Sequence, residues 1–267
     1  MIKEYENGDA LVEENRAVLD TNQYLSQYFI VDAPMVTEPD KNNYALRSQT
    51  EDGRTLLAMK PEPFGLLLFG APENVPELLS HMADRGFEFD RFLCGSDVGE
   101  AVSAFMKVKY GVSFDETLAM DFMEALEVTE PSSPDVVVAT PEDLDELVEC
   151  DRQFIKDCGL VDTVDPEKTL KYIDSFRLIK ENGRIISMAR LTPSPGNAMK
   201  ISYVYTVDEY RGKGYARKVV NYVKNEAILQ GLAATLNVDK KNPVSNHLYS
   251  SLGFRRVFSQ SEYRKRK

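Results

Sequence analysis

The spacing of apolar and polar residues between positions 135 and 267 predicts a succession of strands and helices. Short runs rich in β-branched and aromatic residues predict strands, and they lie at 135–139, 176–180, 184–191, 199–207 and 236–238. Segments with apolar residues at helical spacing predict helices, and they lie at 144–158, 166–172, 218–230 and 243–252. The Asn182-Gly183 pair between two of the strands predicts a hairpin turn.

Residues 203–230 are the stretch around which this order is organised. An apolar strand is followed by a turn with two glycines, Gly212 and Gly214, and then by a helix. Glycine lets a ligand approach the backbone closely, and the unpaired amides at a helix N-terminus attract anions. Four basic residues lie at the same point: Arg211, Lys213, Arg217 and Lys218. This combination predicts a pyrophosphate site; the alternative is a strand–helix turn that needs glycines only for its backbone.

Two common phosphate-binding motifs do not match this turn. A P-loop requires G-x-x-x-x-G-K-[ST] and a Rossmann turn requires G-x-G-x-x-G, whereas Gly212-Lys213-Gly214 is followed by Tyr215, Ala216 and Arg217. A second ordered segment comes next. Asn242 is a predicted N-cap with Pro243 at the first helical position, and Gly253 is predicted to end that helix.

The segment 211–216 resembles the R/Q-x-x-G-x-G/A signature of the GNAT superfamily of acyl-CoA-dependent N-acyltransferases. The second landmark of that family, an asparagine-capped helix that contains a tyrosine and precedes G-F, resembles Asn242-Pro243, Ser245-Asn246, Tyr249 and Gly253-Phe254. The resemblance covers residues 135–267. It implies an α/β (α+β) GNAT fold with a mixed, mostly antiparallel central sheet flanked by helices. It also implies that 135–267 is a catalytic N-acetyltransferase domain that uses acetyl-CoA.

Residues 1–130 repeat much of this order, and 129–134 form a short proline-rich boundary. The pattern predicts two short helices within 8–30, a hairpin at 44–59, a strand at 64–69, a helix at 75–85, a strand at 89–93 and a helix at 98–110. Residues 118–128 fit a strand or a helix. The turn at 70–75 has one glycine, a proline and no cation, so this half is either a degenerate GNAT-like domain without a cofactor site or an unrelated α+β domain.

The resemblance assigns roles to individual residues. The backbone of Val204, Tyr205 and Thr206 is expected to pair with the pantetheine arm. The backbone amides of the turn are expected to hold the pyrophosphate, namely those of Arg211, Gly212, Lys213, Gly214, Tyr215, Ala216 and Arg217. Asn242 and Ser245 are expected to contact the cofactor. Tyr249 is the expected acid for the leaving thiolate, because a phenol is protonated at neutral pH; the alternative is a tyrosine that only packs against Phe254.

No general base follows from the sequence. The strand at 201–207 carries no acidic residue, and the nearby Asp208, Glu209 and Asp239 are of a kind more often found on solvated surface. An amine that loses its proton to bulk water is an equal alternative.

Charge and composition narrow the class of partner. The net charge of −11 divides into −15 for residues 1–134 and +4 for 135–267, and the acidic half disfavours binding to nucleic acid. Three cysteines without a C-x-x-C pair and two isolated histidines predict no metal site and a cytoplasmic protein. Cys150 and Cys158 are both expected to be buried on one helix. No apolar run is long enough to span a membrane.

Three functions remain open at this point. The first is an acetyl-CoA-dependent N-acetyltransferase acting on a small-molecule or peptide amine. The second is a non-catalytic acyl-CoA-binding regulatory protein, favoured by the missing strand carboxylate. The third is an interaction protein that uses the acidic N-terminal half. The sequence leaves the acceptor, the length of the acyl group and the oligomeric state undefined.

Overall fold

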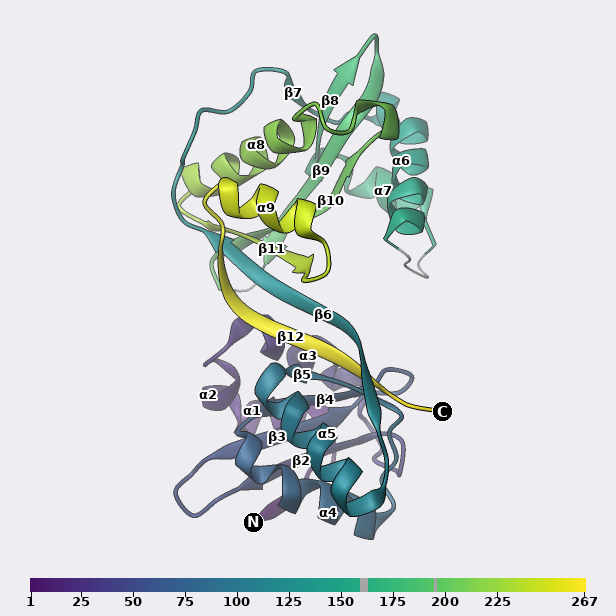
Figure 1. Ribbon diagram of the computed structural model, residues 1–267, viewed down its shortest axis with the longest axis vertical. Coiled ribbons are helices and arrows are strands. Elements are labelled where there is room, and N and C mark those ends of the chain that lie inside the picture. Colours follow the sequence, from purple (N-terminus) through teal and green to yellow (C-terminus); the bar gives the residue numbers. More distant parts are fainter. Residues whose placement is uncertain (159–162, 195) are drawn as a thin grey trace. The chain divides into compact units, whose positions relative to one another are not determined.

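Two compact units divide the chain in the computed structural model, which describes residues 1–158, 163–194 and 196–267 (Figure 1). Unit 1 comprises Met1–Phe122, Asp239–Lys241 and Phe258–Lys267, and unit 2 comprises Met123–Val238 and Asn242–Val257. The expected domains, 1–130 and 135–267, therefore differ from these two units in two places. The last ten residues pack in unit 1, and the linker packs in unit 2.

Unit 1 is a sheet with helices whose elements follow the predicted order. They are β1 (Ile2–Glu4), α1 (Gly8–Glu14), α2 (Arg16–Leu19), α3 (Gln23–Asp32), β2 (Tyr44–Gln49), β3 (Thr55–Lys60), β4 (Leu66–Gly70), α4 (Val75–Arg85), β5 (Arg91–Gly95), α5 (Ser96–Tyr110) and β6 (Phe114–Ala125). The strand order is β1-β2-β3-β4-β5-β12. Residues 8–30 thus form three helices where two were expected, and the ambiguous segment near 118–128 is a strand.

Unit 2 repeats this succession with longer central strands. Its elements are β7 (Val136–Val138), α6 (Leu144–Asp157), α7 (Pro166–Lys171), β8 (Phe176–Glu181), β9 (Arg184–Ser194), β10 (Ala198–Thr206), α8 (Tyr215–Leu229), β11 (Ala233–Asp239), α9 (Pro243–Ser251) and β12 (Arg255–Lys265). The strand order is β7-β8-β9-β10-β11-β6. The pairs β7–β8, β8–β9 and β9–β10 are antiparallel, whereas β10 and β11 are parallel. In unit 1, β4 and β5 are likewise parallel.

Each unit completes its sheet with a strand from the other half of the sequence. Strand β12 pairs with β5, where Gln260–Arg264 lie antiparallel to Arg91–Gly95. Strand β6, which closes the first half of the sequence, is the neighbour of β11. This exchange is the reason why the C-terminal residues belong to unit 1, and no local sequence pattern signals it.

Capping residues explain where the helices of unit 2 begin. Thr140 and Asp143 form a capping box before α6, Asp165 accepts hydrogen bonds from the first amides of α7, and Asn242 does the same for α9. Helix α6 ends at Asp157, one residue earlier than predicted. Cys158 is therefore exposed past the helix end, and the expectation that it is buried was wrong.

Two apolar clusters cover the two faces of the unit 2 sheet. One contains Ile201, Val219, Val223 and Leu236 and joins α8 to the sheet, and the other contains Leu147, Phe176, Met188 and Tyr205 and joins α6 to it. In Figure 1, α8 and α9 are seen beside β9 and β10, with α6 and α7 beside the same strands from the other side. Residues of β10 contribute to both clusters, so side chains pack against this strand on both faces of the sheet.

A fully buried lysine anchors the linker within unit 2. Lys224 on α8 donates hydrogen bonds from Nζ to Thr129 Oγ1 at 2.7 Å and to the carbonyl of Leu252 at 3.0 Å. The amide of Asn225 donates to the carbonyl of Glu130 at 2.8 Å. The burial of Lys224 lowers its pKa, because the charged ammonium is less well solvated there.

Candidate functional site

Strand β10 is irregular at the point where the resemblance places the cofactor. Its register with β9 shifts between Ser202 and Tyr205, and Tyr203 has a φ of +51°, which non-glycine residues seldom adopt. The pairing of β10 with β11 covers only Ala198–Lys200 and Ala233–Thr235. In the described part of the chain, the two strands are not paired from Ile201 onward. The opened edge of β10 can accept an extended chain with amide groups, as an added strand.

The end of β10 is fixed by hydroxyl groups. Ser187 Oγ donates to the carbonyl of Tyr205 at 3.1 Å and lies 2.9 Å from Thr206 Oγ1. Arg211 Nε donates to the carbonyl of Thr206 at 2.9 Å. These bonds hold Tyr205 and Thr206 in place, although this part of β10 is not paired with β11.

The glycine turn leads from this strand into α8 and faces open space. Gly212 and Gly214 have φ values of +75° and +85°, and a Cβ built on either would meet no atom within 4 Å. Helix α8 begins at Tyr215, and no side chain caps its N-terminal amides. The space, the left-handed backbone and the helix N-terminus together make an anion site that any larger side chain would restrict.

Most of the expected positive charge at this turn is already paired. Arg211 contacts Asp157 at 2.5 Å and Asp208 at 2.8 Å, Arg217 contacts Glu130 at 2.7 Å, and Lys218 contacts Asp135 at 2.8 Å. Of the four cations, Lys213 has no ion pair with a described residue, and its ammonium lies 5.0 Å from the centre of the Tyr210 ring. The prediction of a freely basic turn therefore needs correction, although exposed pairs of this kind contribute little and exchange readily.

The residues expected on α9 have structural partners. Asn242 Oδ1 accepts the backbone amide of Ser245 at 3.0 Å, so both residues take part in the helix cap. Tyr249 is 7% exposed, and its ring lies 6.0 Å from that of Phe254 in an edge-on arrangement. Burial raises the pKa of Tyr249 to about 12, with a smaller contribution from the Cys158 thiol. The phenol therefore holds its proton at neutral pH.

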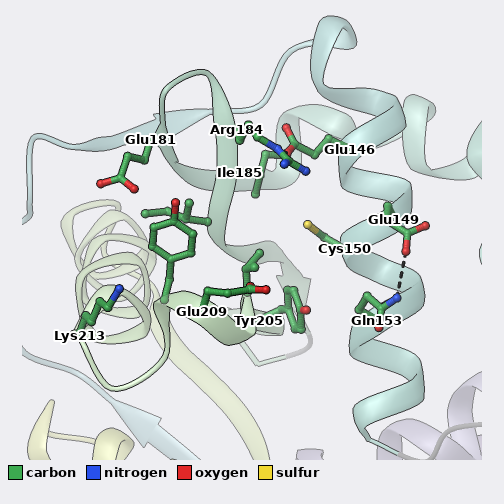
Figure 2. Close-up of a pocket in the computed structure, with 13 residues that line it drawn as sticks. Glu146, Glu149, Cys150, Gln153, Glu181, Arg184, Ile185, Tyr205, Glu209 and Lys213 are labelled. Atoms are coloured by element: carbon green, nitrogen blue, oxygen red, sulfur yellow. Dashed lines mark hydrogen bonds and ion pairs between the residues drawn. The ribbon is translucent and has the colours of Figure 1, made fainter.

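A cavity of about 650 Å³ in unit 2 adjoins both β10 and the glycine turn. Figure 2 shows side chains from α6, the β8–β9 hairpin, β10 and the turn around it. Four carboxylates line it, Glu146, Glu149, Glu181 and Glu209, against two cations, Arg184 and Lys213. Burial raises the pKa of the Cys150 thiol in its wall to about 12, so the thiol is not a nucleophile. An acidic lining suits a cationic ligand and does not suit a pyrophosphate.

One ionisable group near β10 escaped the sequence analysis. Asp151 on α6 is 4% exposed, and its Oδ1 has no hydrogen-bond partner among the described residues. Burial raises the pKa of Asp151 to about 6, while Arg190 acts in the opposite direction. The sequence held a signal, because Leu147, Asp151 and Phe154 recur at the spacing of one helix face. A carboxylate on an otherwise apolar face is unusual enough to be a candidate.

Comparison with known families identifies this arrangement. The family model described as "Acetyltransferase (GNAT) family" matches residues 142–254. These residues form a GNAT acetyltransferase domain. The match includes the bulged strand, the glycine turn and the α9 segment, and it supports acyl-CoA-dependent acetyl transfer as the general class of chemistry. None of the curated proteins compared matches the chain by sequence.

The GNAT fold extends over the whole chain. A GNAT-family acetyltransferase from Colwellia psychrerythraea is similar with a TM-score of 0.65 and 13% identity, covering 100% of both chains. A GCN5-related N-acetyltransferase from Sphaerobacter thermophilus has a TM-score of 0.63 and 12% identity, covering 99% of this chain and 94% of that one. At such identities the likeness concerns the fold alone. It agrees with the repeated order of elements in the two units.

In the part of the chain that the structure describes, unit 1 has the fold and a similarly short parallel pairing, since β4 and β5 are paired only at Leu66 and Leu67, but it lacks the bulge and the open glycine turn. Its β3–β4 register runs without a shift from Leu56–Gly70 to Met59–Leu67. At the turn after β4, a Cβ on Gly70 would lie 2.0 Å from the carbonyl oxygen of Thr55, so this glycine serves close packing. The following Glu73 is an acid, which disfavours an anion. Of the two units, unit 2 therefore combines a bulged strand with an open glycine turn.

Among the described residues, no three His, Cys, Asp or Glu side chains are placed to bind a metal ion. Within the same residues, no helix is both long and apolar enough to cross a membrane.

Proposed function

We propose that the protein is an acetyl-CoA-dependent N-acetyltransferase with one cofactor site, in unit 2. The observation that carries this proposal is the continuity of the opened, bulged edge of β10 with the open glycine turn at the N-terminus of α8. A pantetheine arm carries amide groups, which match an unpaired strand edge, and a pyrophosphate matches a helix N-terminus. No other pair of described strands in unit 2 combines both features.

Each part of this site has a separate task in acyl transfer. The backbone of Val204, Tyr205 and Thr206 pairs with the pantetheine arm, and one amide of this strand donates to the thioester oxygen as negative charge develops there. The amides from Arg211 to Arg217 hold the pyrophosphate. Lys213 is available to it directly, and Arg217 and Lys218 reach it by exchanging their exposed carboxylate partners.

Tyr249 supplies the proton that the departing thiolate requires. Its phenol is protonated at neutral pH, since burial raises its pKa to about 12. Its packing against Phe254 holds the ring in one orientation. Asn242 and Ser245 keep the start of α9 in place through their cap, and their outer atoms contact the cofactor.

The acceptor is a primary amine on a small molecule or a peptide, the class on which GNAT acetyltransferases act. The cavity with four glutamates beside Tyr205 and Lys213 favours a cationic acceptor over an anionic one. A non-catalytic acyl-CoA-binding protein is the second candidate, because β10 carries no carboxylate between Ile201 and Thr206.

Mass spectrometry separates these two functions. The full chain is incubated with acetyl-CoA and a panel of primary alkyl amines, arylalkyl amines and lysine peptides, and both the acetylated product and free CoA are measured. An N-acetyltransferase yields a product that is 42 Da heavier, the mass of an acetyl group replacing hydrogen, in about equal amount to the CoA released. Binding of acetyl-CoA without acetylation of any amine would favour the regulatory protein.

A further inference from the structure

The carboxylate of Asp151 is buried without the partner that such a group normally has. It lies on the face of α6 that also carries Leu147 and Phe154, two residues of the apolar cluster that joins α6 to the sheet. No hydrogen bond or ion pair joins its side chain to any described residue, and Oδ1 is among the buried atoms without a partner. Burying a charge in this way is unfavourable unless another group completes the site.

Contacts place this carboxylate next to the bulge of β10. One turn along the same helix face, the ring of Phe154 lies 5.3 Å from that of Tyr203, the residue at the centre of the bulge. Arg190, which opposes Ser202 across the strand ladder, has its guanidinium 5.8 Å from the Tyr203 ring and acts on the pKa of Asp151. Asp151, Arg190 and the bulge therefore gather on the α6 side of β10.

The Arg190 guanidinium does not bond to Asp151, whose Oδ1 has no hydrogen-bond partner among the described residues. The guanidinium of Arg190 is held elsewhere, since Nε donates to Ser175 Oγ at 3.0 Å and the group stacks 5.4 Å from the Phe176 ring and 5.5 Å from the Tyr172 ring. Arg190 thus favours the ionised carboxylate by its charge without bonding to it. The aromatic rings beside it are already in contact with the guanidinium of Arg190, so the attraction for a protonated amine comes from the free oxygen of the carboxylate itself.

We propose that Asp151 receives the acceptor, a protonated primary amine with an apolar body, and removes the proton that the amine must lose before it attacks the thioester. This inference rests on the proposed function, because it places the acceptor on the face of β10 that α6 covers. Asp151 would thus be the general base of the reaction, since β10 itself contains no acidic residue.

The proton balance of the step is complete. The ammonium gives one proton to Asp151, and the neutral nitrogen forms a bond to the thioester carbon. The nitrogen of the tetrahedral adduct carries two hydrogens and loses one of them to solvent. When the C–S bond breaks, the thiolate takes a proton from Tyr249, which recovers one from solvent. Asp151 then releases its own proton to solvent. The sum is an acetamide, free CoA and one proton.

The ionisation of Asp151 suits this task at neutral pH. With a pKa raised to about 6, it is mostly ionised above pH 7 and still more basic than an exposed aspartate. Arg190 on β9 is the charged group that acts on the pKa of Asp151, Cys150 is its neighbour on α6, and Tyr172 and Tyr203 contact Arg190. None of these side chains is an acid that ordinarily titrates near pH 6.

The test compares Asp151→Asn with Asp145→Asn and the unaltered protein. Asp145 is exposed on the same helix and lies outside the site, so its substitution controls for loss of one carboxylate from α6. The assay is CoA release with acetyl-CoA and a panel of alkyl and arylalkyl primary amines, followed from pH 5 to pH 9. Acetyl-CoA affinity is measured for each protein by calorimetry.

We expect Asp151→Asn to lower kcat by roughly 10²–10⁴-fold, the usual contribution of a general base. We also expect it to remove the limb of the pH–rate profile near pH 6, with acetyl-CoA affinity unchanged. Asp145→Asn should keep both the rate and the limb. Equal rates and profiles for Asp151→Asn and an active unaltered protein would overturn this proposal alone. Failure of the unaltered protein to acetylate any amine of the panel, with or without binding of acetyl-CoA, would contradict the proposed function and this inference with it.

Discussion

Replacing Asp151 by asparagine should stabilise unit 2 at neutral and alkaline pH. The carboxylate is 4% exposed and has no hydrogen-bond partner among the described residues, so its charged form is poorly solvated in the folded protein. Its pKa is raised to about 6, against about 3.9 in an unfolded chain. The folded state therefore binds this proton more tightly than the unfolded state does.

The sign and size of the effect follow from this difference. The protonated carboxyl favours the folded state fully below pH 4, and this contribution is lost as the pH rises through about 6. Two pKa units correspond to about 3 kcal/mol in the free energy of unfolding. Asparagine has no proton to lose. At pH 8 the free energy of unfolding of the variant should therefore exceed that of the unaltered protein by up to about 3 kcal/mol. This difference in stability should disappear towards pH 4.

Urea denaturation at several pH values, followed by tyrosine fluorescence, measures this gap. The free energy of unfolding is extrapolated to zero urea for Asp151→Asn, Asp145→Asn and the unaltered protein at pH 4.5, 6 and 8. Asp145→Asn should show no comparable gain, because its side chain is exposed. A variant Asp151→Asn that is less stable than the unaltered protein at pH 8 would refute the reasoning, since it would mean that the carboxylate has a stabilising partner.

Two further predictions concern α8 and α9. Tyr249→Phe keeps the ring packing and removes only the hydroxyl, so kcat should fall by about 10²–10⁴-fold with little change in the KM for acetyl-CoA. A raised KM with unchanged kcat would assign the hydroxyl to binding, and full kcat with chemistry rate-limiting would remove it from the mechanism. Lys224→Met leaves Thr129 Oγ1 and the Leu252 carbonyl without their buried donor, which should lower the free energy of unfolding by about 1–3 kcal/mol. Urea denaturation checks this, and an unchanged midpoint would show that the ammonium contributes nothing to the anchoring of the linker.

Local features of the fold could be read from the sequence because their causes are local. Gly212 and Gly214 do adopt left-handed conformations, and Asn242 does cap its helix. In each case the responsible residue lies within a few positions of the turn or helix it determines. The GNAT order of strands and helices in 135–267 was predicted for the same reason, because the spacing of apolar residues within each segment indicates a strand or a helix.

Features that depend on distant residues were not predicted. The exchange of β6 and β12 depends on pairing between segments more than a hundred residues apart, such as Gln260 with Gly95. The positive charge of the glycine turn was overestimated because the partners of Arg211 and Arg217 are Asp157 and Glu130, which lie far away in the sequence. The bulge at Tyr203 has no signature, because a tyrosine with positive φ is held by the surrounding strands and not by its own preference.

For the candidate base, Asp151, the sequence could predict burial but not the neighbouring residues. Asp151 stands at an apolar position of a helix whose periodicity was recognised, so its burial was accessible to the sequence. What the sequence could not supply was its placement, because only the packing of α6 on β9 and β10 brings it beside Arg190 and Tyr203. The proposed base therefore comes from α6, and the residue pattern of β10 itself does not indicate it.

Acetyl-CoA binding to a matched pair of glycine variants tests the central claim most directly. Gly214 and Gly231 lie just before and just after α8, with φ values of +85° and +76°, and a Cβ on either meets no atom within 4 Å. Replacement by aspartate thus imposes a similar backbone strain at both ends of one helix, but only Gly214→Asp puts a side chain and a negative charge into the proposed pyrophosphate site. Calorimetry should give one acetyl-CoA site per chain for the unaltered protein and for Gly231→Asp, and no measurable binding for Gly214→Asp. Unchanged acetyl-CoA binding by a folded Gly214→Asp variant would contradict the account.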